Sequence, residues 1–155
     1  MLILGMDPGS LSFGIGLLKK DRNQFAYLYS EVIKLKEKDF VNRMQTLWTR
    51  LNQLTERFAI DEAAMEEGFL GKNIRSMSLL SMVRGVAMAA LLQRGVPLRL
   101  YSPREVKLAL TGYGNAEKSQ LAKMAALVLD IRDKKLGLDE SDALAVAYCH
   151  GVQRR

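Results

Sequence analysis

The sequence of 155 residues contains one cysteine, one histidine, one tryptophan and three prolines. The single cysteine, Cys149, excludes an intrachain disulfide and favours a reducing compartment, so we expect a cytoplasmic protein. No uninterrupted run of 18 apolar residues occurs, which predicts that no segment spans a membrane. The N-terminus also lacks the basic segment and cleavage site of a secretory signal, so we expect none.

Acidic residues are fewer than basic ones, and apolar residues are plentiful. The chain has 23 Lys and Arg against 17 Asp and Glu, a net charge of +6, which is compatible with a polyanionic partner but does not require one. Apolar residues make up 48% of the sequence, which is enough to form a buried core, so we expect a folded and not a disordered chain. No linker, repeat or low-complexity segment divides the chain, so we expect a single domain over residues 1–155.

The order of apolar patterns predicts a mixed α/β fold. Residues 2–7, 11–18 and 24–33 are predicted to be three strands joined by two consecutive hairpins. Two further strands are predicted over residues 63–66 and 96–101. Helices are predicted over residues 39–58 and 74–93, from Pro103 after a capping box, from Asn115 to about residue 130, and from Asp139 onward. Hairpin strands followed by strands that alternate with helices are typical of a sheet covered by helices.

Four acids stand at informative places in this pattern. Asp7 and Glu66 each end an apolar strand, whereas Asp139 and Asp142 lie three residues apart in the first turn of a helix and so share a face. Buried strand ends seldom carry a charge unless it is paired or bound to a metal. Carboxylates without His or Cys suit Mg²⁺ or Mn²⁺, and two such ions can activate a water and hold the leaving oxygen of a phosphodiester.

Each of these acids also has an ordinary structural explanation. Asp is a good turn residue, and the first turn of a helix favours negative charge. Glu67 competes with Glu66 for a place beside Asp7, because strand alternation sends the two glutamates to opposite faces. Trp48 lies on the apolar stripe of the helix at 39–58, where we expect it to be core.

The blocks around the acids resemble the RuvC family of Holliday junction resolvases, over nearly the whole chain. The resemblance rests on GMDPGS at residues 5–10, MEEGF at 65–69, RG at 84–85, GYGNAEKSQ at 112–120 and DESDALA at 139–145. It implies a ribonuclease-H-like fold, with a mixed five-stranded sheet flanked by helices. It also implies a Mg²⁺-dependent endodeoxyribonuclease that resolves four-way DNA junctions by paired symmetric nicks, in recombination and repair.

The resemblance also implies roles for single residues. It makes Asp7, Glu66, Asp139 and Asp142 the catalytic acids that hold two Mg²⁺ ions, with Mn²⁺ as a substitute. It makes Phe69 a side chain that stacks on DNA, and Lys107 and Lys118 residues that hold the scissile phosphates or assist catalysis. Further basic residues lie on loops or at helix starts, where together they can track phosphates: Lys72, Arg75 and Arg104. A homodimer through the helix at 74–93 is implied as well, and a RuvA–RuvB branch-migration complex is left open as a partner.

The sequence departs from the family pattern just before and within its last acidic block. The loop before Asp139 lacks the usual prolines, and Glu140 and Ser141 replace small residues, which leaves the metal geometry open. Two other functions also stay open, an RNA-processing nuclease with the same fold and a junction-binding module without chemistry. Cleavage assays on a DNA junction, a duplex and an RNA–DNA hybrid separate these alternatives.

Overall fold

One mixed β-sheet forms the centre of the structure, a computed structural model that describes residues 1–68 and 73–154. In the described chain its strand order is β3-β2-β1-β4-β5. The strands are β1 (Leu2–Asp7), β2 (Ser12–Asp21), β3 (Gln24–Lys34), β4 (Glu62–Glu66) and β5 (Leu98–Tyr101). The first three pair antiparallel, whereas β4 and β5 continue the sheet in parallel with β1. The predicted mixed five-stranded sheet is therefore confirmed.

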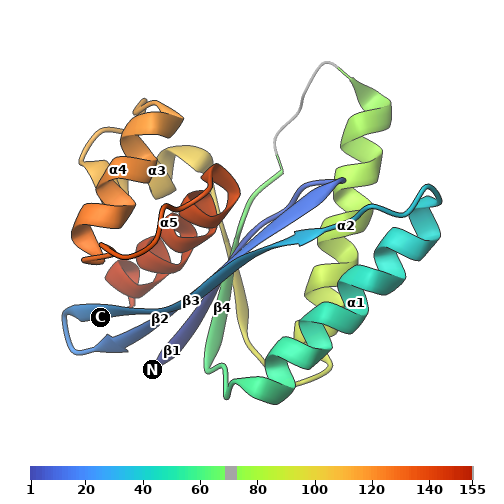
Figure 1. The fold of residues 1–155 in the computed structure, drawn as a ribbon, viewed down its shortest axis with the longest axis horizontal. Coiled ribbons are helices and arrows are strands. Elements are labelled where there is room, and N and C mark those ends of the chain that lie inside the picture. The colour runs from blue at the N-terminus through green and yellow to red at the C-terminus, as the bar shows by residue number, and fades with distance from the viewer. Residues whose placement is uncertain (69–72, 155) are drawn as a thin grey trace.

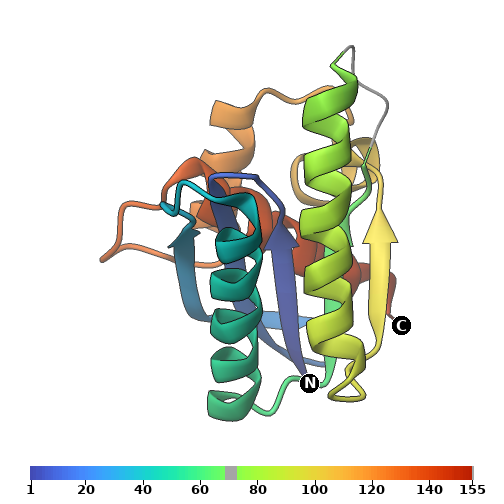
Figure 2. The same ribbon diagram turned by 90° about the vertical axis from the view of Figure 1, so that its right-hand side faces the viewer.

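Helices cover both faces of this sheet and give three layers (Figure 1). On one face lie α1 (Phe40–Arg57) and α2 (Ile74–Leu92), which run side by side in Figure 2. On the other face lie α3 (Pro103–Thr111), α4 (Lys118–Val128) and α5 (Leu138–Gln153). The capping box predicted at Ser102 is present, with its hydroxyl accepting from the Glu105 amide and the Glu105 carboxylate accepting from the Ser102 amide.

Strand alternation in β1 decides which side chains meet which layer. Leu4 and Met6 belong to the apolar cluster that contains residues of α1 and α2, whereas Ile3 packs with residues of α5. A Cβ atom on Gly5 would lie 1.9 Å from the carbonyl oxygen of Ala143, so only glycine lets α5 approach β1 this closely. By the same alternation Asp7 faces α5.

Three details differ from the sequence-based expectations. The second hairpin is tighter than predicted, because β2 extends to Asp21 and Arg22 adopts a left-handed conformation at a φ of 52°. Glu117, and not Asn115, is the residue before the first turn of α4. The Trp48 side chain is 36% exposed, because α1 buries a narrower stripe around Leu47 and Leu51.

Helix α2 is apolar on nearly all sides but buried on only one. Its buried residues are Val83, Ala87, Ala90 and Leu91, whereas Ile74, Met82 and Leu92 are exposed. By length and composition alone the helix is long and apolar enough to cross a membrane, although polar and charged residues interrupt it before residue 86. Its buried side packs against α1 and the sheet, and the rest of its apolar surface is left open in the single chain.

Candidate active site

Two of the predicted acids stand side by side at one edge of the sheet. Asp7 ends β1 and Glu66 ends the neighbouring parallel strand β4, where Met6 is paired with Met65. Ala64 packs with residues of α5, so alternation turns Glu66 to this face as well, the same side as Asp7. Glu67 follows the strand and is exposed. Of the two glutamates, Glu66 is therefore the one that shares a face with Asp7.

Helix α5 brings the third acid to this edge. Asp142 lies in its first turns and is only 7% exposed. Together with Asp7 and Glu66 it lines a pocket of about 270 Å³, whose remaining walls come from α3 and α4. Lys107 of α3 and Lys118 of α4 line the same pocket. Three acids and two lysines that are far apart in the sequence thus meet in one hollow.

Asp139 lies at the margin of this group. Its Oδ2 accepts a hydrogen bond of 2.7 Å from the Ser12 hydroxyl of β2, and it is not among the residues that line the pocket. A Cβ atom on Gly14 would lie 2.2 Å from the Asp139 carbonyl oxygen, so the first turn of α5 rests directly on β2. Ser12 was not identified from the sequence, because a serine that follows a turn carries no distinctive signal.

The crowding of carboxylates changes their proton affinities. Burial, together with the negative charges of Asp142 and Glu66, raises the pKa of Asp7 from 3.8 to about 7. Burial and then Asp142 also raise the pKa of Glu66, whereas the positive charges of Lys118, Arg84 and Lys107 oppose the rise. A group of acids that repel one another in a partly buried pocket favours the binding of a cation.

Lys118 supplies positive charge inside the pocket. Its Nζ donates a hydrogen bond of 3.0 Å to Oδ2 of Asp142 and forms an ion pair with it. This bond and the charge of Asp142 raise the pKa of Lys118, so the amine stays protonated. Its side chain is 69% exposed, which leaves the ammonium group accessible to a ligand of the pocket.

The donor atoms of the pocket fit a hard divalent cation, because all are carboxylate oxygens that lie among other negative charges. As placed, no three Asp, Glu, His or Cys side chains of residues 1–68 and 73–154 stand in an arrangement that holds a metal ion. Asp142 is paired with Lys118 and Asp139 with Ser12. Metal binding by these acids would therefore require side-chain rotations.

Glu140, one of the two unusual residues between Asp139 and Asp142, makes its contacts outside the pocket. Glu140 is buried, and its carboxylate accepts hydrogen bonds from the Ser30 hydroxyl at 2.9 Å, the Gly137 amide at 3.0 Å and the Lys134 ammonium. Burial alone would raise the pKa of Glu140, but these bonds outweigh it and lower the pKa. Glu140 therefore anchors the start of α5 to β3 and does not compete for a metal.

The other predicted site residues either lie outside the acid pocket or belong to the part of the chain that the structure does not describe. Arg75 is exposed at the start of α2 and Arg104 is exposed on α3, and neither lines the acid pocket. Phe69 and Lys72 lie outside the described residues.

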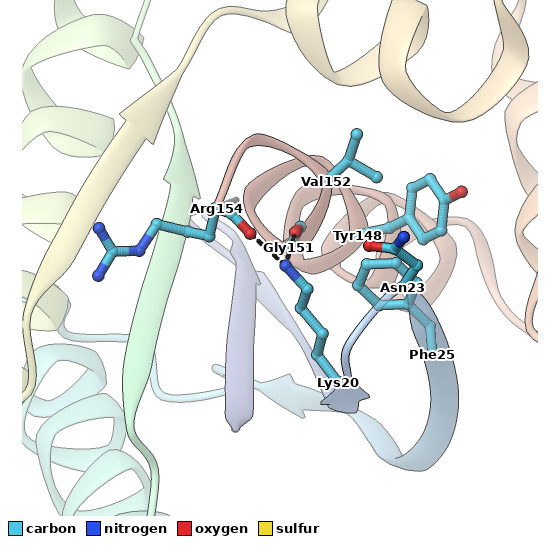
Figure 3. Close-up of a pocket in the computed structure, with 7 residues that line it drawn as sticks. All are labelled: Lys20, Asn23, Phe25, Tyr148, Gly151, Val152 and Arg154. Atoms are coloured by element: carbon cyan, nitrogen blue, oxygen red, sulfur yellow. Dashed lines mark hydrogen bonds between the residues drawn. The ribbon is translucent and has the colours of Figure 1, made fainter.

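A second hollow of about 220 Å³ lies at the far end of α5 and contains no predicted site residue (Figure 3). Phe25 and Tyr148 form an aromatic wall there, with ring centroids 4.7 Å apart. Lys20 donates to the carbonyl oxygens of Gly151 and Arg154. These bonds satisfy carbonyls at the end of a helix, so the lysine has a structural role.

Comparison with known proteins gives a consistent result over the whole chain. The family model described as crossover junction endodeoxyribonuclease RuvC matches residues 3–150. RuvC of Christiangramia forsetii is 40% identical over 150 residues, which cover 96% of this chain and 78% of that protein. RuvC of Ruminiclostridium cellulolyticum is 36% identical, with 100% of this chain and 94% of that protein covered.

Solved structures agree with the sequence comparisons. RuvC of Thermus thermophilus in complex with a Holliday junction substrate superimposes with a TM-score of 0.92 at 29% identity, covering 100% of this chain and 95% of that one. The fowlpox virus resolvase, at 15% identity and a TM-score of 0.63, shares the fold. The chain belongs to the RuvC family of crossover junction endodeoxyribonucleases.

Proposed function

We infer that this protein is a structure-specific endonuclease that resolves four-way DNA junctions in recombination and repair. The observation that carries the proposal is the meeting of Asp7, Glu66 and Asp142 in one pocket, on a fold that superimposes on a junction-bound RuvC. The basic net charge of +6 suits a DNA partner, because lysines and arginines gain affinity by neutralising phosphates. We expect it to act in the cytoplasm.

The reaction is hydrolysis of a phosphodiester bond. Nucleases of this family depend on divalent metal ions, and we propose two Mg²⁺ ions per site, held by Asp7, Glu66, Asp142 and Asp139. When bound, the ions supply an activated water and a counter-charge for the leaving oxygen. Cleavage of the bond between phosphorus and the 3′-oxygen leaves a 5′-phosphate and a 3′-hydroxyl, which a ligase can rejoin.

The lysines of the pocket have a separate role in this proposal. Lys118 and Lys107 project into the pocket from α4 and α3, opposite the strand ends that carry Asp7 and Glu66. A protonated amine at this place can hold a non-bridging oxygen of the scissile phosphate and stabilise the charge that develops there. Lys72, Arg75 and Arg104 would contact phosphates farther along the DNA, and Phe69 would stack on a base.

The exposed apolar face of α2 supports a two-fold dimer. Met82 is 53% exposed and Leu92 59%, and an added Cβ on Gly85 would meet nothing within 4 Å, so a second helix could approach closely here. Two copies related by a two-fold axis would present two acid pockets to a junction whose strands have the same symmetry. Each copy would then nick one of two opposite strands.

The acid assignment is tested by Asp7→Asn, which keeps the shape of the side chain and removes its charge. We expect junction cleavage in Mg²⁺ to fall at least about 100-fold while junction binding in Ca²⁺ is retained. Asp133→Asn, at an exposed loop position, is the matched control and should cleave like the parent. Parent-like cleavage by Asp7→Asn, or robust cleavage by the parent in EDTA, would overturn the metal-dependent mechanism.

The substrate is tested by presenting a DNA junction, a linear duplex and an RNA–DNA hybrid to the parent protein in parallel. The proposal predicts that the junction is cut and the other two substrates are not. Preferred cleavage of the hybrid would instead assign the chain to RNA processing, and binding without cutting would reduce it to a junction-binding module.

A further inference from the structure

Arg84 of α2 extends toward the acid pocket from the opposite layer of the fold. Its neighbours on the helix, Val83 and Ala87, are buried in the same apolar cluster as Met65, the residue that precedes Glu66. The Arg84 side chain is half-buried, and its charge acts on Glu66 more strongly than that of Lys107 does. The residue was not predicted from the sequence to have a role in the site.

The Arg84 guanidinium lies directly on the backbone of Gly68, two residues after Glu66. A Cβ atom on Gly68 would be 2.6 Å from Nη1 of Arg84, closer than real Cβ contacts come, and 3.0 Å from its Cζ. Gly68 has no positive φ, since the glycines with positive φ in the described chain are Gly95 and Gly112. A side chain at residue 68 would therefore displace the packed Arg84 guanidinium and would not strain the backbone.

The Nε–H group of Arg84 is buried and has no hydrogen-bond acceptor among the described residues. A buried donor without a partner is unfavourable, and such groups in folded proteins call for a specific reason. Here the planar guanidinium packs against Gly68, in the chain that leaves β4, and its positive charge opposes the rise in the pKa of Glu66 that burial and Asp142 cause.

We propose that Arg84 is a positioning residue for Glu66. The Arg84 guanidinium packs on Gly68 and holds the end of β4, so that the Glu66 carboxylate faces Asp7 and Asp142. The inference rests on the proposed function, because it assigns to Arg84 the outer support of a metal-binding acid. Such supporting residues typically change metal affinity about 10- to 100-fold when removed. It also ties helix α2 to the geometry of the acid pocket.

The test is a titration of the DNA-free protein with Mn²⁺, in which the electron paramagnetic resonance signal of the free ion measures how much is bound. The charge of Arg84 and its supporting role predict opposite changes in Mn²⁺ affinity when the residue is replaced. Removal of a positive charge near carboxylates strengthens cation binding, whereas loss of a support for Glu66 weakens it. We expect Arg84→Met to weaken Mn²⁺ binding about 10-fold. Lys107→Met is the control for charge, because Lys107 also acts on Glu66 but lines the pocket itself, and it should bind Mn²⁺ equally or more tightly.

Two further variants separate geometry from charge. Arg84→Lys keeps the charge but lacks the planar group, so it should lose affinity for Mn²⁺ as Arg84→Met does. Gly68→Ala should push the guanidinium aside and weaken binding several-fold in the parent, yet add nothing in the Arg84→Met background. Gly68 is exposed, so this variant remains informative if a change at Arg84 prevents folding.

The outcomes distinguish this inference from the proposed function. A parent protein that binds no Mn²⁺ and cuts no junction would overturn both. A parent that binds Mn²⁺, with Arg84→Met or Arg84→Lys binding it as tightly or more tightly, would overturn the role of Arg84 alone. Additive effects of Gly68→Ala and Arg84→Met would likewise contradict the contact on which the inference depends.

Discussion

Among the acids of the pocket, Asp7 has the environment that differs most from that of a free carboxyl group in water. Burial and the charges of Asp142 and Glu66 hold its pKa at about 7, and Lys118 only partly offsets them. An acid that is disfavoured in its charged form lowers the stability of the fold in exchange for a function. The acid pocket is therefore a place where stability and activity should change in opposite directions.

Asp7→Asn should stabilise the metal-free protein at high pH. Between pH 3.8 and about 7 the native state keeps a proton on Asp7 that the unfolded chain has lost, so stability falls as the pH rises through this window. The variant avoids this loss, and we expect its free energy of unfolding at pH 8 to exceed that of the parent by about 2–4 kcal/mol. The difference should shrink toward pH 4, as measured by urea denaturation in EDTA.

Saturating Mg²⁺ at pH 8 provides the control for this prediction. The parent should regain stability when the ion binds its carboxylates, whereas Asp7→Asn should gain little, so the two proteins should approach each other. A variant that is less stable than the parent at pH 8 in EDTA would show that the Asp7 carboxylate is held by favourable contacts.

Lys118→Ala should separate chemistry from binding. In the proposed reaction the Lys118 ammonium group contacts the scissile phosphate, so its loss should reduce the single-turnover cleavage rate about 100-fold and change the junction Kd little. Lys123→Ala, an exposed lysine on the same helix, is the matched control for the loss of one positive charge. Equal effects of the two substitutions on the cleavage rate would contradict a specific role for Lys118.

At the scale of elements, the position of α5 determines the geometry of the site. The helix is held against β1 and β2 by close backbone contacts at Gly5 and Gly14, and it carries Asp139 and Asp142 in its first turns. Ser12 and Ser30 donate hydrogen bonds to Asp139 and Glu140 from two neighbouring strands. The start of α5 is thus held on the sheet by hydrogen bonds from β2 and β3.

Gly14→Ala should move this helix. The new Cβ would lie 2.2 Å from the Asp139 carbonyl oxygen, and backbone on backbone cannot yield without a shift of the helix. We expect a loss of stability of about 3 kcal/mol and a marked drop in cleavage. Parent-like stability of Gly14→Ala would contradict the close approach of α5.

The elements were largely predictable from the sequence because their patterns are local. Apolar runs that end in Asp7 and Glu66 indicated strands, and parallel neighbours necessarily bring such ends to one edge. Contacts between distant segments were not predictable, such as Glu140 with Ser30, or Arg84 with Gly68. Charged residues on loops and helices carry no periodic signal that would identify their partners.

At the scale of the whole molecule, the proposed dimer explains why α2 is apolar on its exposed face. Gly85→Arg would place a long charged side chain in the proposed helix–helix contact and should yield a monomer in sedimentation at micromolar concentration. Leu127→Arg is the matched control, because Leu127 is 74% exposed on α4 in the opposite layer. A parent that is already monomeric, or a Gly85→Arg variant that remains dimeric, would contradict a dimer through α2.

Paired resolution by two acid pockets can be observed directly by mapping the cuts in a four-way junction, labelled on each of its four strands in turn. We expect the parent protein in Mg²⁺ to nick two opposite strands of like polarity at symmetric positions. The products should be nicked duplexes that carry 5′-phosphates and 3′-hydroxyls and that a DNA ligase seals. Cuts on a single strand, cuts without two-fold symmetry, or ends that a ligase cannot seal would contradict it.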